Sequence, residues 1–317
     1  MNNSKLYIIE ICTEEFKHQY LHILKPKIIY IAGDGRSGST LLDSILSNIE
    51  GSVSVGECHR FWVRFYEKET LCGCGEKIER CTLWSKIDEK LHQKFPDYDS
   101  EFIREKVKEI QYFKNFKKIP KLLQTKEWQD FAEIVIYFYN QIAKTSQRNI
   151  IIDSSKSIGW CYFLQNIGVF DLRIIHLERN LASVANSWKK KMLLPEYYDK
   201  DVFMPQKTNM VILKSWIKIK VLALALKKNN YFMFLKYESL CQRPEFWLAK
   251  IKEFVGEPFD ITEFIMIPTH SIGGNPMRSG SNKKIVISNK KVDLHHLNFF
   301  EKIFFKSSNV IAKTIIK

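Results

Sequence analysis

The stretch from residue 28 to residue 42 combines an apolar run, a turn rich in glycine and serine, and leucines at helical spacing: IIYIAGDGRSGSTLL. A strand, a glycine turn and a helix in this order form a layout that binds phosphate groups. Glycine lets the backbone approach an anion closely, and the start of a helix offers N–H groups that have no partner within the helix. The stretch therefore predicts an anion-binding loop.

The spacing of residues within this loop limits the kind of anion that it can bind. Gly33 and Gly38 are five residues apart, as in the nucleotide-binding pattern G-x-x-x-x-G-K-[ST]. Ser39 stands where that pattern has its lysine, and Arg36 is the only cation of the turn. Kinases and NTPases need that lysine on the β- and γ-phosphates. The loop therefore suits an anion with fewer charges and no metal, and a turn that serves only close packing is the alternative.

Two polar residues follow the next strand-like run, residues 52–55. Glu57 comes directly after the pair Val55-Gly56, and His59 lies two residues further on. Because open α/β sheets bind ligands at the carboxyl ends of their strands, Glu57 is expected near the loop. His59 is a rival proton acceptor, since the ordinary pKa of histidine is near neutrality. A carboxylate that only pairs with a nearby lysine is the alternative for Glu57.

Cysteines cluster after this segment. Cys72, Cys74 and Cys81 are close enough in sequence to bind Zn²⁺, but a fourth ligand is needed and the C-x-C spacing is unusual. Cys58 or His59 could supply that ligand. A structural or redox-sensitive staple is the favoured interpretation, and we predict no metal.

The elements that must position these groups alternate between strands and helices. Residues 149–156, 172–177 and 231–236 are further strand candidates, and the order indicates a doubly wound, mainly parallel α/β sheet of P-loop-like type. A cysteine-rich and helical insertion spans about 58–148. Two series of apolar residues recur there at helical spacing and are expected in the core: Phe102, Val107, Ile110 and Phe113, and then Phe131, Ile134, Val135, Phe138 and Ile142. Residues 1–26 are expected to be an N-terminal extension, and residues 27–317 a single domain.

The 317 residues carry a formal net charge of +14, which suits polyanionic partners or a solvated lysine surface. The basic residues are scattered without an RNA-binding signature, so nucleic acid is not an expected partner. No 18-residue apolar run and no export signal are visible, and the seven cysteines are odd in number. These features predict a reduced cytoplasmic protein without a transmembrane segment.

Residues 35–42, GRSGSTLL, resemble the 5′-phosphosulfate loop of sulfotransferases that use 3′-phosphoadenosine 5′-phosphosulfate (PAPS). The form with arginine and a following Leu-Leu is typical of the tyrosylprotein and carbohydrate branches and their bacterial relatives. The resemblance implies that PAPS is the co-substrate and that no metal is required. It also implies a cofactor-binding loop made of Gly35, Arg36, Ser37, Gly38, Ser39, Thr40 and Leu41.

The same resemblance assigns roles to residues further along the chain. Glu57 stands 57 − 36 = 21 residues after Arg36, at the family's interval for a proposed general base. Lys156 ends a D-S-S-K strand that resembles the strand beside the bound sulfonate, where a lysine stabilises charge on the bridging oxygen. Arg36 neutralises the leaving oxygen.

Further matches concern the 3′-phosphate. Arg179 and Ser187 are eight residues apart, as in the family's R-[ND]-P…S element, although Leu181 replaces the usual proline. Arginine offers a planar, bidentate clamp for phosphate. A glycine-rich segment after His270 resembles a loop whose arginine, here Arg278, reaches the same phosphate.

Taken together, the resemblance implies transfer of a sulfuryl group from PAPS to a hydroxyl or amine. A small molecule, a saccharide and a lipid all stay open as acceptors, as does a peptide tyrosine. A P-loop kinase or NTPase is one alternative, for which Asp153 could serve as a strand-end carboxylate. A non-catalytic anion- or nucleotide-binding protein is the other.

Overall fold

The computed structural model describes residues 25–67, 70–97, 99–194, 197, 201–260, 263–273, 283–285, 287 and 294–315. Its centre is a sheet of five parallel strands in the order β2-β3-β1-β4-β5. This confirms the predicted doubly wound α/β class. The strands are β1 (Lys27–Gly33), β2 (Ser52–Gly56), β3 (Ile150–Lys156), β4 (Asp171–Glu178) and β5 (Phe232–Lys236).

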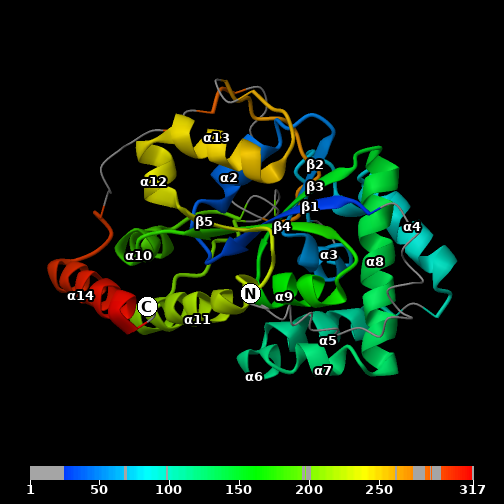
Figure 1. The fold of residues 1–317 in the computed structure, drawn as a ribbon, viewed down its shortest axis with the longest axis horizontal. Coiled ribbons are helices and arrows are strands. Elements are labelled where there is room, and N and C mark those ends of the chain that lie inside the picture. Colours follow the sequence, from blue (N-terminus) through cyan, green and yellow to red (C-terminus); the bar gives the residue numbers. More distant parts are fainter. Residues whose placement is uncertain are drawn as a thin grey trace, which may run out of the picture.

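The sheet is apolar on both faces, as a parallel sheet between two helical layers must be. Along β1, Ile29 and Ile31 pack on one side, whereas Ile28 and Tyr30 pack on the other. Figure 1 shows the two layers of helices above and below the strands. The first layer holds α2 (Ser39–Leu46), α12 (Tyr237–Gln242) and α13 (Pro244–Val255); the second holds α9 (Ile158–Ile167) and α11 (Asn209–Leu226).

Helices fill the predicted insertion between β2 and β3. Phe131 and Phe138 are fully buried there, as predicted, but Phe113 is 56% exposed. That prediction fails because one helix ends at Gln111 and another begins at Phe113, which breaks the helical periodicity. The helices are α3 (Phe61–Arg64), α4 (Trp84–Lys94), α5 (Ser100–Gln111), α6 (Phe113–Phe116), α7 (Ile119–Leu122) and α8 (Lys126–Ser146), with 3-10 turns at Cys58–Arg60 and Ile78–Arg80.

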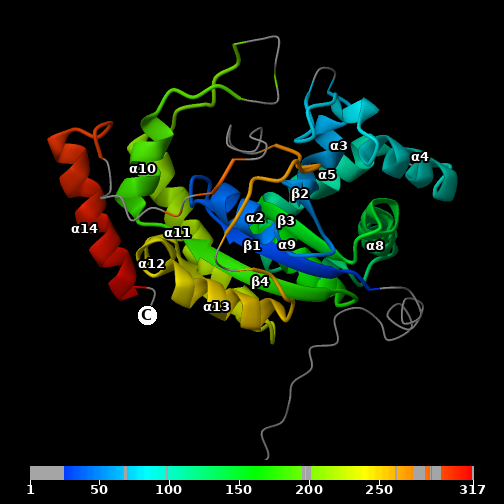
Figure 2. The same cartoon turned by 90° about the horizontal axis from the view of Figure 1, so that it is seen from above.

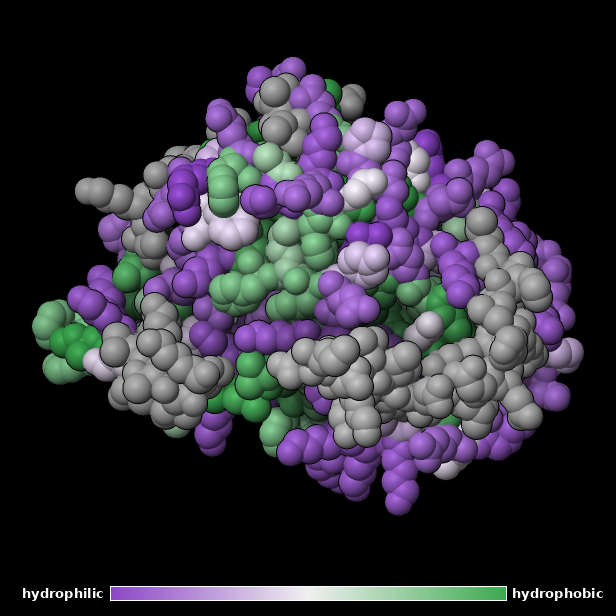
Figure 3. Space-filling view, in the orientation of Figure 1, coloured by the Kyte–Doolittle hydropathy of each residue, from purple (hydrophilic) through white to green (hydrophobic). Residues whose placement is uncertain are grey.

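Two helices complete the fold at the opposite end of the molecule. Helix α14 (Phe299–Ile315) lies beside α10 (Leu181–Lys189), far from α4 and α8 (Figures 1 and 2). Figure 3 shows that hydrophilic side chains cover most of one face and that apolar ones gather near its centre. Within the described residues, no helix has both the length and the apolar character needed to cross a membrane.

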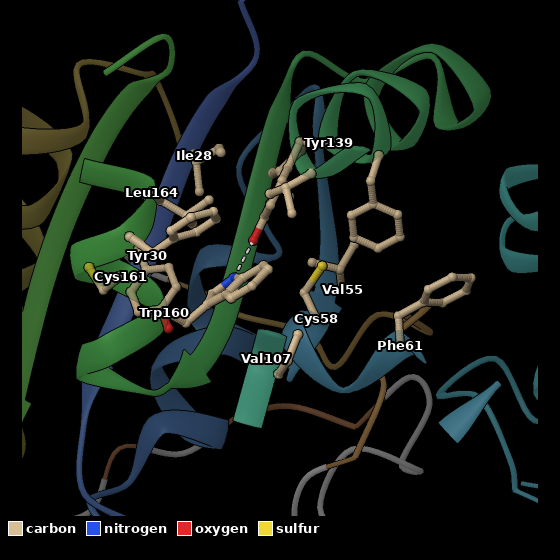
Figure 4. Packing of buried hydrophobic residues seen from close by; sticks show 14 of the residues in the cluster. Ile28, Tyr30, Val55, Cys58, Phe61, Val107, Tyr139, Trp160, Cys161 and Leu164 are labelled. Carbon is tan, nitrogen blue, oxygen red and sulfur yellow. Dashed lines mark hydrogen bonds between the residues drawn. The ribbon is translucent and has the colours of Figure 1, made fainter. Parts of the chain in front are cut away.

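A buried polar network joins the helical layer to β3. The Trp160 indole N–H donates to the Tyr139 hydroxyl at 3.0 Å, as Figure 4 shows. That hydroxyl donates to Asp153 at 2.5 Å, and the Ser155 amide donates to the same carboxylate at 2.8 Å. Burial raises the pKa of Asp153 to about 6. The Asp153 carboxylate thus links β3 to α8 directly and to α9 through the Tyr139 hydroxyl.

Replacing Gly159 by alanine should destabilise the fold. Helix α9 packs so closely on α5 that a Cβ at Gly159 would lie 2.4 Å from the Ile110 carbonyl oxygen. Overpacking of this kind costs about 1–3 kcal/mol, so the midpoint of thermal unfolding should fall by several degrees. The matched control is Gln165→Ala on the same helix, and equal midpoints for the two variants would contradict the packing argument.

Candidate active site

The carboxyl ends of the parallel strands open into a cavity of about 850 Å³. Within β1, Gly33 pairs with Leu177 of β4, and Gly56 of β2 pairs with Asp153 of β3, so the loops after these strands meet at one edge of the sheet. Most of the residues singled out from the sequence line this cavity: Gly35, Arg36, Gly38, Ser39, Thr40, Leu41, Glu57, His59, Lys156, Arg179 and Ser187.

The glycine-rich loop ends at the N-terminus of α2. Gly38 is the N-cap residue with φ 96°, and no side chain caps this end of the helix. A Cβ at Gly38 would lie 2.3 Å from the Tyr237 ring, so only glycine fits there. The first amides of α2 are therefore available to an anion at the positive end of the helix dipole.

Ser37 lies differently from its neighbours in the loop. Its side chain is buried, at 1% exposure, and its hydroxyl finds no hydrogen-bond partner among the described residues. It is not among the residues that line the cavity. Any contact of Ser37 with a ligand would therefore involve its backbone.

Arg179 is fastened to the loop. Its Nη1 donates to the carbonyl oxygen of Arg36 at 3.1 Å, and its guanidinium lies 4.6 Å from the centre of the Tyr237 ring. The turn after β4 forms without the proline expected at position 181. Asn180 caps α10 by accepting from the Ala182 amide at 2.9 Å. Helix α10 then carries Ser187 to the cavity wall.

An ion pair lines the same cavity. Lys156 donates to Glu57 at 2.6 Å, and Arg60 donates to the other oxygen of Glu57 at 3.2 Å. Burial by itself would raise the pKa of Glu57, but Lys156 and Arg60 outweigh it and lower the pKa to about 2. Glu57 is therefore ionised at neutral pH. It pairs with a lysine, which was the alternative considered from the sequence, and it also lines the cavity.

His59, the rival base, sits beside this pair. Its side chain is 7% exposed, and its Nδ1 has no partner among the described residues. Burial lowers the pKa of His59 to about 3, and the cations Arg60 and Lys156 act in the same direction. The imidazole is therefore neutral at physiological pH.

Sequence reasoning missed three residues of the cavity wall. Lys207 places its ammonium group 3.8 Å from the centre of the Trp188 ring, while Arg36 lies 5.0 Å from it. Burial lowers the pKa of Lys207. Tyr237, at the start of α12, supports Arg179. Neither periodicity nor spacing marks these positions, because Trp188 on α10, Lys207 in the loop before α11 and Tyr237 on α12 meet only in the folded chain.

The rest of the cavity has a different character. Its apolar lining consists of the nearly buried Val107, Ile110 and Phe116 of the insertion and the partly exposed Ile219 and Leu222 of α11. Lys108 and Lys218 also line it. Arg278, the expected second ligand of the 3′-phosphate, lies outside the described residues, as do residues 1–24 of the expected N-terminal extension.

A model of the sulfotransferase domain family matches residues 26–307. No curated protein matches the chain.

Among solved structures, the sulfotransferase domain from the Synechococcus PCC 7002 olefin synthase is 21% identical, covers 93% of this chain and 96% of its own, and has a TM-score of 0.47. The sulfotransferase domain from the curacin biosynthetic pathway is 17% identical over 89% and 96% of the two chains, with a TM-score of 0.47. Mouse sulfotransferase SULT7A1, complexed with PAP, is 12% identical over 96% and 95%, with a TM-score of 0.43. The family model spans most of the sequence, and on that ground the chain belongs to the sulfotransferase domain family.

Proposed function

We propose that this sulfotransferase takes the sulfuryl group from PAPS and transfers it to a hydroxyl or amine of its acceptor. One observation carries the proposal: a lysine-free glycine loop at the start of α2, held by Arg179, lines the same cavity as the Glu57–Lys156 pair. An anion site and a proton acceptor are thereby within reach of one bound molecule. Family membership supports the sulfotransferase activity itself.

The cofactor roles follow from the charges. Among the backbone N–H groups of residues 37–41, those of Gly38, Ser39 and Thr40 would bind the 5′-phosphosulfate, because they lie at the positive end of α2. The amides of Ser37 and Leu41 donate within the turn, to the carbonyl oxygens of Asp34 and Gly38. Arg179 and Ser187 would bind the 3′-phosphate, and Arg36 would neutralise the leaving oxygen. Arg278 keeps its proposed role at the 3′-phosphate on the resemblance of its motif alone.

In the reaction, the acceptor oxygen forms a bond to sulfur while the bond from sulfur to the bridging oxygen of PAPS breaks. The acceptor proton goes to Glu57, and 3′,5′-adenosine diphosphate leaves with its charge stabilised by Lys156 and Arg36. As Lys156 turns toward the leaving oxygen, the charge that holds down the pKa of Glu57 moves away. Glu57 would become a stronger base as the transfer begins.

The apolar surface around Ile110 with its lysines favours an acceptor that has an apolar body and a negative charge. The kinase and NTPase alternative is not favoured. Asp153, its candidate strand-end carboxylate, is fully buried, is bonded to Tyr139 and Ser155, and does not line the cavity. A non-catalytic binding protein is the alternative that an assay must exclude.

Incubation of the purified chain with ³⁵S-labelled PAPS and fractionated host metabolites should yield a labelled product, with anionic amphiphiles labelled ahead of neutral sugars.

Calorimetry should show that 3′,5′-adenosine diphosphate binds equally with and without added Mg²⁺, since Arg179 and the helix N-terminus supply the positive charge. Tighter binding of ATP–Mg²⁺ would overturn the proposed cofactor. Binding of the bisphosphate without any transfer would favour the non-catalytic alternative.

Arg179→Ala should weaken the binding of 3′,5′-adenosine diphosphate far more than it slows the chemical step. Loss of a charged bidentate contact costs roughly 1.5–3 kcal/mol, so the affinity measured by calorimetry should fall about ten- to a hundredfold. Arg243→Ala, which removes an exposed arginine outside the cavity, is the control. An unchanged affinity in Arg179→Ala would remove this residue from the nucleotide site.

Glu57→Gln should leave nucleotide affinity nearly intact and reduce single-turnover transfer about 10²–10⁴-fold, because the amide keeps the shape but cannot accept the proton. The exposed Glu79→Gln is the matched control. A Gln variant with near-full rate would transfer the role to His59, and His59→Ala would then be the inactive variant.

The pH profile of kcat/KM refines this prediction. Because the pKa of Glu57 is about 2, the free enzyme should lose activity through this group only in strong acid. Lys156→Met removes the charge that does most to lower the pKa of Glu57, so the loss of kcat/KM in acid should begin at a higher pH. An acid limb that stays in place would argue against Glu57 as the base.

A further inference from the structure

Three cysteines of the insertion meet a histidine from the far end of the chain. Cys72, Cys74, Cys81 and His270 each offer one ligand atom, and these four atoms lie within 4.8 Å of one another. The sulfurs of Cys74 and Cys81 are 3.8 Å apart, and the Cys81 sulfur is 3.2 Å from Nδ1 of His270. None of the four residues lines the large cavity.

The 3.8 Å between the sulfurs of Cys74 and Cys81 matches an edge of a tetrahedron around zinc, and the 3.2 Å from the Cys81 sulfur to Nδ1 of His270 is about 0.4 Å shorter than such an edge. With Zn–S of about 2.3 Å and Zn–N of about 2.0–2.1 Å, a tetrahedral site has S···S edges of about 3.8 Å and S···N edges of about 3.6 Å. Three sulfurs and one imidazole form a Cys₃His set, which is typical of structural zinc sites.

The backbone around the sulfurs is arranged for thiolates. The amides of Cys74, Glu76 and Trp84 donate to the sulfurs of Cys72, Cys74 and Cys81 in turn. Gly75, with φ 93°, lies in the tight turn between Cys74 and Glu76, and its amide donates to the Cys72 carbonyl oxygen at 3.0 Å. Such N–H groups offset the negative charge of thiolates and fix the orientation of metal ligands.

The histidine segment is held against the cysteine segment by other contacts. The Trp84 indole N–H donates to the carbonyl oxygen of His270 at 2.8 Å, and the Gly73 amide donates to that of Ser271 at 2.9 Å. A Cβ at Gly73 would lie 2.3 Å from the Ser271 hydroxyl, so the two segments of the chain are in direct contact. The fourth ligand is thus brought to the cysteines by the fold itself.

We propose that Cys72, Cys74, Cys81 and His270 bind a structural Zn²⁺ ion. The site is closed, because all four positions belong to protein side chains, so the ion takes no part in sulfuryl transfer. The candidates considered from the sequence for the fourth position do not occupy it: Cys58 packs in the core (Figure 4), and His59 faces the cavity.

The site also bears on Glu57. Two residues after His270, the Ile272 amide donates to Val55 at 3.0 Å, and the Ile272 carbonyl accepts from the Glu57 amide at 2.7 Å. A metal that fixes His270 therefore fixes the segment that orients the backbone of Glu57.

The test measures metal rather than activity, so it stands apart from the proposed function. The full chain, purified under reducing conditions, should contain about one equivalent of zinc by mass spectrometry of the elements. Cys81→Ser and His270→Ala should bind zinc at least tenfold more weakly in competition with a chromophoric chelator. Cys241→Ser, which removes a cysteine outside the cluster, should keep the full equivalent.

A second measurement has the wild-type chain as its main subject, so its first result needs no variant to fold. The wild-type chain loaded with Co²⁺ should show the visible bands of a tetrahedral site with thiolate ligands, and His270→Cys should add thiolate-to-metal intensity. Less than a tenth of an equivalent of Zn²⁺ or Co²⁺ bound by reduced wild-type protein would overturn the proposal. So would zinc uptake that is equal in wild type and Cys81→Ser, or a Cys74–Cys81 disulfide that persists under reductant.

Discussion

The pairing of β1 with both β3 and β4 is the constraint on which the site depends. Because all three strands run parallel, their carboxyl ends reach the same edge of the sheet, and the chain must leave each of them there. The glycine loop and Arg179 directly follow β1 and β4, and Lys156 is the last residue of β3. A sheet buried on both faces can be stable only between two layers of helices, and those helices also form the walls of the cavity.

Within the cavity, opposed electrostatic effects set the state of each group. Burial disfavours charge, and it leaves His59 neutral. The same burial acts on Glu57, but two cations at hydrogen-bond distance reverse its effect and keep the carboxylate ionised. Two neighbouring groups that could accept a proton therefore differ in charge at neutral pH. In the proposed reaction, movement of Lys156 alone changes the basicity of Glu57.

The segment 269–273 connects two parts of the molecule that otherwise have different tasks. On one side it contacts the cysteine turn through Gly73 and Trp84, and on the other it holds the Glu57 backbone through Ile272. In a domain of this kind, the proposed zinc ion would stabilise a loop arrangement that apolar packing alone does not specify. The polar network around Asp153 does the corresponding work beneath β3.

Local sequence patterns determined the strands, the glycine loop and most helices, because isoleucine runs, glycine turns and periodic apolar residues act over a few residues. The eight-residue step from Arg179 to Ser187 lies within one strand end and the helix that follows it. Only the tertiary structure decided which distant side chains meet. Glu57 pairs with Lys156 across 99 residues, and Cys81 meets His270 across 189. Such pairings depend on strand order and loop paths, which no local periodicity encodes.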